Sequence, residues 1–245
     1  MLKLMGKKKT DAEVKIKKDI DYKVSVKCKT KAQKKFLDEM KDKKNEICFG
    51  IGSPGTGKSF LSLAYALREL KAGTFERIIM VVPTAQAGGA DLNIGLLKGT
   101  LEEKVEMFKQ ADQDTIEKIL KLSGNEEYKK IAKKLISENF IQYEFINFLL
   151  GKTLDDALIL VNECEQYTKE NMRLILTRLG ENSKIIVTGD SKQVNRKSIV
   201  SGKDICGLSY VADKLKELDE VSVTEFTDED IVRNKLIVKI LKLID

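Results

Sequence analysis

A glycine-rich segment between two apolar stretches constrains the fold of this chain most strongly. It satisfies the pattern G-x-x-x-x-G-K-[ST] in full, with the residues Gly52, Ser53, Pro54, Gly55, Thr56, Gly57, Lys58 and Ser59. The short apolar run 46–51 before it is of strand type, and the apolar residues of 59–71 after it recur with helical spacing. A strand, a glycine-rich turn and a helix in this order predict a loop whose backbone amides cradle phosphate groups.

Two side chains of this loop have predicted roles toward a bound nucleotide. We expect the ammonium of Lys58 to bridge the β- and γ-phosphate oxygens and the hydroxyl of Ser59 to coordinate Mg²⁺. The helix that begins near Lys58 adds the positive end of its dipole, which favours the negative charge of the phosphates.

Polar residues also follow two other strand candidates. The run 158–161 is fully apolar and ends in Asn162 and Glu163, which is the form of a Walker B strand. Glu163 is placed to orient or deprotonate an attacking water, whereas Asn162 stands where a magnesium-shell Asp is usual and brings no charge. The strand candidate 184–187 ends in Thr188-Gly189-Asp190, a third polar group for the same sheet edge, which could sense the γ-phosphate or hold the lytic water.

Apolar strand candidates alternate with helical patterns along the rest of the chain. Further strands are predicted at 77–82, 140–145 and 221–226, and helices at 31–40, 101–122, 126–136, 169–179 and 228–243. This alternation predicts an α/β fold with a mostly parallel sheet and helices on both faces. We expect one domain over residues 31–245, preceded by an arm over residues 1–30 in which 22–26 could form an edge strand.

The charge of the chain is concentrated at its N-terminus. Residues 1–35 carry 13 Lys and four acidic residues, a net charge of +9, which leaves −3 for the remaining 210 residues of a chain with net charge +6. A basic arm on a slightly acidic body can contact the phosphates of a nucleic acid. A solvated charged edge without a partner is the alternative.

The composition excludes several kinds of site. The chain has no histidine, which excludes Ser-His-Asp and Cys-His catalysis and every histidine-ligated zinc site. The four cysteines (Cys28, Cys48, Cys164 and Cys206) include no C-x-x-C pair and are expected to be reduced thiols. Neither a secretory signal nor a run long enough to span a bilayer is present, so we expect a cytoplasmic protein without a membrane partner.

The motifs, taken in order, resemble those of the PhoH-like proteins. These are P-loop ATPases related to the core of superfamily-1 helicases, and large phages often carry them. The segments ICFGIGSPGTGKS, VPTAQAGGADLNIGLLKGTLEEK, GKTLDDALILVNECEQ, LTRLGENSKIIVTGDSKQV and DEDIVRN carry the resemblance, which covers residue 31 to the C-terminus. It implies a RecA-like domain that binds ATP and Mg²⁺, hydrolyses ATP, and couples hydrolysis to RNA or single-stranded DNA.

The resemblance also implies roles for single residues. Gln33 becomes a candidate for contacting adenine, Glu163 the catalytic acid, and Arg233 the arginine of the last motif, while Asp190 and Gln193 follow the sensor strand. The predicted catalytic set is therefore Lys58, Glu163, Asp190 and Arg233, with Ser59 and Glu163 holding Mg²⁺ through ATP and water.

One departure from the family pattern supports a second hypothesis. The acidic box of the family reads Asp-Glu-Ala-Gln-Asn, whereas this chain has Asn162, Glu163, Cys164, Glu165 and Gln166. Because the charged metal ligand is missing, the protein could instead be an ATP-responsive nucleic-acid-binding or assembly protein with little turnover. A small-molecule kinase is disfavoured because only six arginines are present for a lid, and a GTPase because no N-K-x-D motif occurs.

The length of the chain predicts an assembly. Superfamily-1 helicases place ATP between two RecA-like domains, and about 210 residues of body supply only one. We therefore expect a homo-oligomeric ring, a hexamer, in which Arg233 or Arg178 reaches the γ-phosphate of a neighbouring copy.

Overall fold

The described part of the chain is built on a single parallel sheet. The structure is a computed structural model and describes residues 20–82, 101–190 and 207–233. Its six strands lie in the order β3-β2-β4-β5-β1-β6, and every neighbouring pair is parallel. The strands are β1 (Ile47–Gly52), β2 (Arg77–Val82), β3 (Ile141–Phe145), β4 (Ala157–Val161), β5 (Lys184–Gly189) and β6 (Val221–Phe226).

The strands are apolar because both faces of the sheet are covered. Successive side chains point to opposite faces, so Cys48 and Ile186 join one buried cluster while their neighbours Phe49 and Val187 join the other. The central strand β4 is buried along its whole length. These two clusters form the core of the domain.

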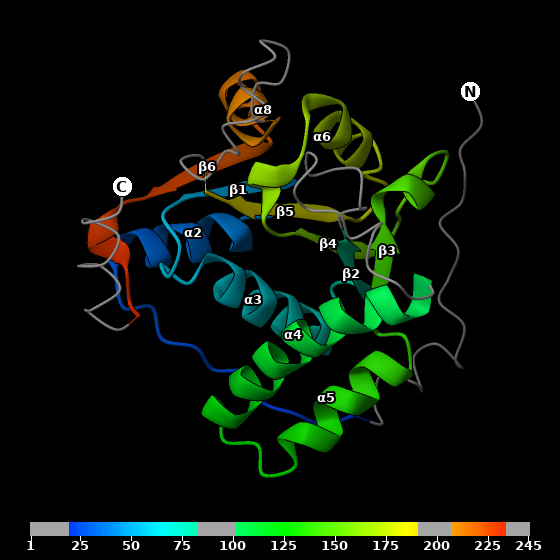
Figure 1. The fold of residues 1–245 in the computed structure, drawn as a ribbon. Coiled ribbons are helices and arrows are strands. Elements are labelled where there is room, and N and C mark those ends of the chain that lie inside the picture. Colours follow the sequence, from blue (N-terminus) through cyan, green and yellow to red (C-terminus); the bar gives the residue numbers. More distant parts are fainter. Residues whose placement is uncertain (1–19, 83–100, 191–206, 234–245) are drawn as a thin grey trace.

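Helices pack on each face of the sheet, as Figure 1 shows. One face carries α2 (Lys31–Lys41), α3 (Lys58–Ala72), α4 (Leu101–Leu122) and α5 (Tyr128–Ser137). The other carries α6 (Lys169–Leu176) and α8 (Gly207–Leu215), with the short 3₁₀ turns η2 (Ile146–Leu149) and η3 (Cys164–Gln166). The prediction of an α/β, RecA-like P-loop fold is confirmed, although the sequence patterns did not predict α8.

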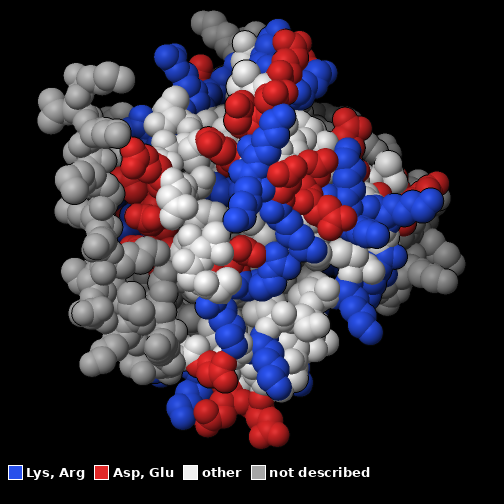
Figure 2. Space-filling view, turned by 180° about the vertical axis from the view of Figure 1, so that it is seen from behind, with Lys and Arg blue, Asp and Glu red and all other residues white. Residues whose placement is uncertain are grey.

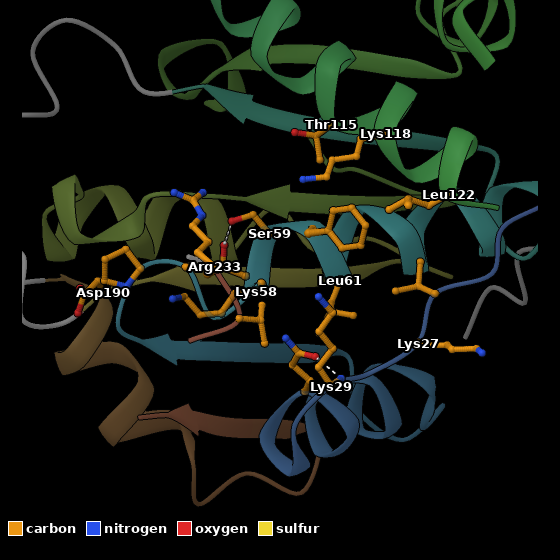
Figure 3. A pocket seen from close by; sticks show the side chains of 18 of the residues that line it. Lys27, Lys29, Lys58, Ser59, Leu61, Thr115, Lys118, Leu122, Asp190 and Arg233 are labelled. Atoms are coloured by element: carbon orange, nitrogen blue, oxygen red, sulfur yellow. Dashed lines mark hydrogen bonds between the residues drawn. The ribbon is translucent and has the colours of Figure 1, made fainter. Parts of the chain in front are cut away.

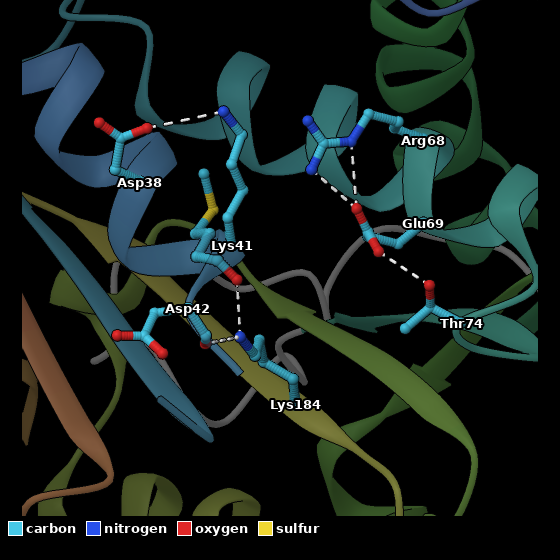
Figure 4. Close-up of polar contacts among 8 residues, drawn as sticks. Asp38, Lys41, Asp42, Arg68, Glu69, Thr74 and Lys184 are labelled. Carbon is cyan, nitrogen blue, oxygen red and sulfur yellow. Dashed lines mark hydrogen bonds and ion pairs between the residues drawn. The ribbon is translucent and has the colours of Figure 1, made fainter. Parts of the chain in front are cut away.

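A buried lysine joins α2 to the amino end of the sheet. Lys184 begins β5 and is only 5% exposed, and its ammonium donates to the carbonyl oxygens of Met40 (2.6 Å) and Asp42 (2.8 Å) (Figure 4). Burial lowers the pKa of Lys184, while nearby acidic groups such as Cys48 and Asp42 oppose the shift. The lysine satisfies carbonyls at the end of α2, where cations interact favourably with the helix dipole.

The predicted edge strand at 22–26 is wrong. Residues 20–30 are extended but form no ladder with the sheet; instead, backbone groups of Lys23 and Ser25 bond to the side chains of Asn125 and Ser123. Tyr22 is 4% exposed, and its hydroxyl donates to the carbonyl oxygen of Leu67 (2.9 Å). The chain therefore packs against the body from about residue 20, while residues 1–19 of the predicted arm lie outside the described ranges.

The predicted helix at 228–243 is wrong at its start. Asp228–Asp230 is a 3₁₀ turn, η4, closed by a capping box between Thr227 and Asp230. Ile231 is then extended, and the amide of Val232 donates to the carbonyl oxygen of Gly55 (3.1 Å). This contact with a distant loop diverts the chain from helical geometry. Residues 234–243 of the predicted helix and the glycine-rich segment 83–99 lie outside the described ranges.

The two signs of charge are mixed on the surface. Figure 2 shows lysine and arginine side chains interspersed with aspartate and glutamate over the face seen from behind. Among the helices that the structure describes, none has both the length and the apolar character needed to cross a bilayer.

Candidate active site

The strand order brings three polar strand ends together at the carboxyl edge of the sheet. β5 lies between β1, which leads into the glycine-rich loop, and β4, which leads into Asn162 and Glu163. Gly50 of β1 pairs with Thr188 of β5, so the end of β5 is level with the start of the loop. The carboxyl edge of an open parallel sheet is where ligands bind in this class of fold.

The loop between β1 and α3 holds the ammonium of Lys58. Gly55 and Gly57 have φ angles of 82° and 86°, left-handed values that favour glycine and allow the tight turn. Lys58 is 7% exposed, and its Nζ donates to the carbonyl oxygens of Gly52 (2.5 Å) and Ser53 (2.8 Å). An anion entering the loop would meet this cation together with the first amides of α3, which is the arrangement that binds phosphate.

Burial and neighbouring carboxylates shift the pKa of Lys58 in opposite directions. Burial lowers its pKa, while Asp190, Glu163 and Glu165 raise it. The site thus combines one buried cation with three acidic side chains.

Segments from both ends of the chain support the loop. The Ser53 hydroxyl donates to Asp228 Oδ1 (2.5 Å), and Gln33 Nε2 donates to the carbonyl oxygen of Thr56 (2.8 Å). Gln33, the predicted adenine contact, also accepts a hydrogen bond from the backbone amide of Lys29 (2.7 Å) and lines the pocket. The carboxamide therefore fixes the loop as well as facing the place where a nucleotide would lie.

A chain of hydrogen-bonding side chains joins Ser59, a predicted magnesium ligand, to Asn162, which stands where a magnesium-shell Asp is usual. The Thr188 hydroxyl donates to Asn162 Oδ1 (2.8 Å) and lies 3.3 Å from Ser59 Oγ, so the Ser59 hydroxyl is the donor in that second contact. The structure thus brings Ser59 and Asn162 together through Thr188, which is 1% exposed. Hydroxyl, amide and carboxylate oxygens are the ligands that Mg²⁺ takes in proteins, so these residues fit that ion.

Three acidic residues lie at the ends of β4 and β5. Glu163 is exposed, has a left-handed φ of 53°, and lines the pocket, as does Asp190. Glu165 is 7% exposed, and its Oε2 accepts a hydrogen bond from the amide of Asp190 (3.0 Å). Burial, together with a hydrogen bond to Glu163, raises the pKa of Glu165 to about 7. Glu165 therefore fixes the backbone that carries Asp190.

The two candidate arginines lie at opposite ends of the sheet. Arg233 is exposed and lines the pocket, with its Cδ 3.2 Å from the position that a Cβ on Gly55 would occupy. Arg178 lies beyond the amino ends of β4 and β5, where it donates to the carbonyl oxygens of Lys152 (3.0 Å) and Leu174 (3.2 Å). The structure thus brings Arg233, and not Arg178, to the loop of its own chain. Gln193 lies outside the described residues.

One pocket of about 650 Å³, shown in Figure 3, is lined by Gln33, Lys58, Ser59, Glu163, Thr188, Asp190 and Arg233. Asn162, Glu165 and Arg178 are not among the residues that line it. The pocket continues from the glycine-rich loop along the first turn of α3, between α4 and the extended segment 20–30. The sequence patterns missed this far part, because its residues belong to no motif and come from three separate elements. They include Val26, Lys27, Lys29, Phe60, Thr115, Lys118 and Leu122.

Comparison with known proteins agrees with this geometry. A family model described as PhoH-like protein matches residues 25–245. The PhoH-like protein of Bacillus subtilis (strain 168) is 33% identical over 221 residues, which are 90% of this chain and 64% of that protein. The PhoH-like protein of Mycobacterium tuberculosis (strain ATCC 25618 / H37Rv) is 33% identical over 217 residues, 89% of this chain and 57% of that protein.

A more distant relative is Protein PhoH of Escherichia coli (strain K12), 28% identical over 209 residues that make up 85% of this chain and 55% of that protein. The chain thus spans less than two thirds of the length of these curated relatives. The family match covers the glycine-rich loop, the strand ends beside it and the segment of Arg233. This chain therefore belongs to the family of PhoH-like proteins.

Proposed function

We propose that the protein binds ATP with Mg²⁺ at the glycine-rich loop, hydrolyses it, and couples hydrolysis to RNA or single-stranded DNA. The observation that carries the proposal is the hydrogen-bonded series Ser59–Thr188–Asn162 at the mouth of the loop that holds Lys58. Glu163 lines the same pocket. A cation, hydroxyl groups and a carboxylate are the groups that phosphoryl transfer uses, and their proximity supports the proposal.

Each residue has a distinct task in this proposal. The loop amides and Lys58 would bind the phosphates, exchanging the carbonyl partners of Lys58 for phosphate oxygens. Ser59, Asn162 and Glu163 would hold Mg²⁺, directly or through water, and the bound ion would neutralise charge on the phosphate oxygens. Glu163 follows β4, is exposed and lines the pocket, so it would orient an attacking water there and accept its proton.

The proposal includes partners. The net charge of +9 in residues 1–35 favours a polyanionic partner such as RNA or single-stranded DNA. A single RecA-like body supplies one wall of the nucleotide site, which supports assembly into a homo-oligomeric ring, a hexamer.

A second candidate function is ATP-responsive binding with little turnover. Asn162 favours it, because its amide oxygen carries no charge and already accepts the Thr188 hydroxyl. A site of this kind would bind nucleotide through the loop but stabilise the metal less during hydrolysis.

Steady-state phosphate release from Mg-ATP separates the two candidates. The first candidate function predicts phosphate release that RNA or single-stranded DNA stimulates. It also predicts that the rate of release falls by about 100-fold or more in Lys58→Ala and Glu163→Gln. Lys129→Ala, an exposed change on α5 outside the pocket, is the control and should match the parent protein. Tight ATP binding without turnover would favour the second candidate, and absence of ATP binding would contradict both.

A further inference from the structure

The end of the pocket at the glycine-rich loop carries the two acidic side chains together with the cations Lys58 and Arg233, whereas the charged residues that line the other end are all basic. Of the described residues that line it, the two acidic ones, Glu163 and Asp190, lie at the ends of β4 and β5. Away from them, Lys118 of α4 lies on one side of the pocket and Lys27 and Lys29 of the extended segment lie on the other (Figure 3). The proposed ATP site accounts for the first end and leaves the second unexplained.

The two walls of the basic end are fixed to each other. The backbone amide of Lys23 donates to Asn125 Oδ1 (2.8 Å), and that of Ser25 donates to Ser123 Oγ (2.9 Å). Ser123 and Asn125 directly follow α4, the helix that carries Lys118. The extended segment is therefore held against the end of α4, and lysines of both elements are among the residues that line the pocket between them.

These lysines have no acidic partner within the described part of the chain, where no carboxylate lies at ion-pair distance from Lys27, Lys29 or Lys118. Other lysines do pair, such as Lys71 with Asp21 (2.6 Å) and Lys152 with Glu144 (2.8 Å). Three like charges around one pocket create a positive potential that favours an anion. The surface near them is apolar, formed by Val26, Phe60 and Leu122.

We propose that this basic end is a second anion site, which binds a phosphate carried on the ribose of a nucleotide whose 5′-phosphates occupy the glycine-rich loop. The apolar surface would contact the nucleoside, and the lysines would bind the additional phosphate. The inference rests on the proposed function for the position of the 5′-phosphates. A free nucleotide 3′,5′-polyphosphate and the first residue of a 5′-triphosphorylated RNA share this chemistry.

Calorimetric titration of matched nucleotide pairs tests the site. The first pair is ADP and its 3′-phosphorylated form, and the second is ATP and the dinucleotide pppApA, each with Mg²⁺ at low ionic strength. The additional phosphate should tighten binding to the parent protein by about tenfold, because it meets two or three unpaired cations. Raising the salt concentration should reduce this gain more than it reduces ADP binding.

Variants of the exposed lysines test whether the tighter binding caused by the additional phosphate depends on this site. In Lys27→Ala/Lys118→Ala the affinity ratio within each pair should fall to near one. Lys121→Ala removes a neighbouring charge from the same helix outside the pocket and should keep the ratio of the parent protein. All three positions are exposed, so the changes should leave the fold intact.

Each outcome has a definite meaning. A gain for both pairs, or for one, supports the site, and a gain for pppApA alone identifies a polynucleotide as the source of the phosphate. Equal binding within both pairs, or a gain that persists in the double variant, overturns the second site alone. If neither ADP nor its 3′-phosphorylated form binds, the proposed function fails as well.

Discussion

At the scale of single residues, Asn162 is the uncharged member of the proposed metal site. Its Oδ1 accepts the Thr188 hydroxyl, so an Asp at this position could keep that hydrogen bond while adding a negative charge. We expect Asn162→Asp to lower the Mg²⁺ concentration for half-maximal turnover by about tenfold, because divalent-cation affinity rises with ligand charge. Turnover itself should also rise, as measured by phosphate release over a Mg²⁺ titration.

The control for this change is Asn171→Asp, which adds the same charge on α6 outside the pocket. It should leave the Mg²⁺ requirement as it is in the parent protein. If Asn162→Asp leaves both the turnover and the Mg²⁺ requirement unaltered, Asn162 is not part of the metal site.

At the scale of elements, the packing of α4 against β3 contains a half-buried carboxyl group. Burial raises the pKa of Asp112 to about 6, while the adjacent Tyr143 hydroxyl opposes the shift. A raised carboxyl pKa means that the folded state binds the proton more tightly than the unfolded state. Protonated Asp112 therefore contributes fully to the stability of the fold below about pH 4, the pKa of an unperturbed Asp. This contribution is lost as the pH rises through 6.

Asp112→Asn should remove this loss of stability with rising pH, because an amide stays neutral between pH 4 and pH 7. Urea unfolding at pH 4, 5, 6 and 7 should show the parent protein losing on the order of 2 kcal/mol from this group, and the variant gaining relative to it at pH 7. Asp114→Asn, an exposed change on the same helix, is the matched control. Parallel pH profiles for the parent and Asp112→Asn proteins would contradict the assignment.

Among the helices and strands, some could be predicted from the sequence patterns and others could not. The strands are short apolar runs that fill both cores, so β1, β2, β4 and β5 follow from composition and length alone. In residues 22–26 the alternation correctly reflects burial, with Tyr22 inward and Lys23 outward. It does not reveal the pairing partner, because the side chains of Ser123 and Asn125 replace a neighbouring strand.

At the scale of the whole molecule, the site depends on contacts between distant parts of the chain. The motifs place Lys58, Ser59 and Asn162 at one sheet edge, because parallel strands end together. They do not show that Asp228 holds Ser53, a contact across 175 positions, or that Val232 binds Gly55. The basic end of the pocket was equally beyond prediction, since Lys27 and Lys118 line the same pocket only because the segment of Lys27 is held against the end of α4.

The position of Arg233 in the folded chain makes a prediction about how subunits share catalysis. Its side chain lies over Gly55 of its own loop, and Val232 is hydrogen-bonded to that residue.

An arginine that acts on the γ-phosphate contributes about 10³–10⁵ in rate, so Arg233→Ala and Lys58→Ala should each be inactive alone. Because both changes damage the same site, mixing the two proteins under conditions of subunit exchange should restore no ATP turnover. The parent protein mixed with Lys58→Ala controls for dilution. Recovered turnover in the Arg233→Ala and Lys58→Ala mixture would instead place Arg233 in the site of a neighbouring copy of the proposed ring.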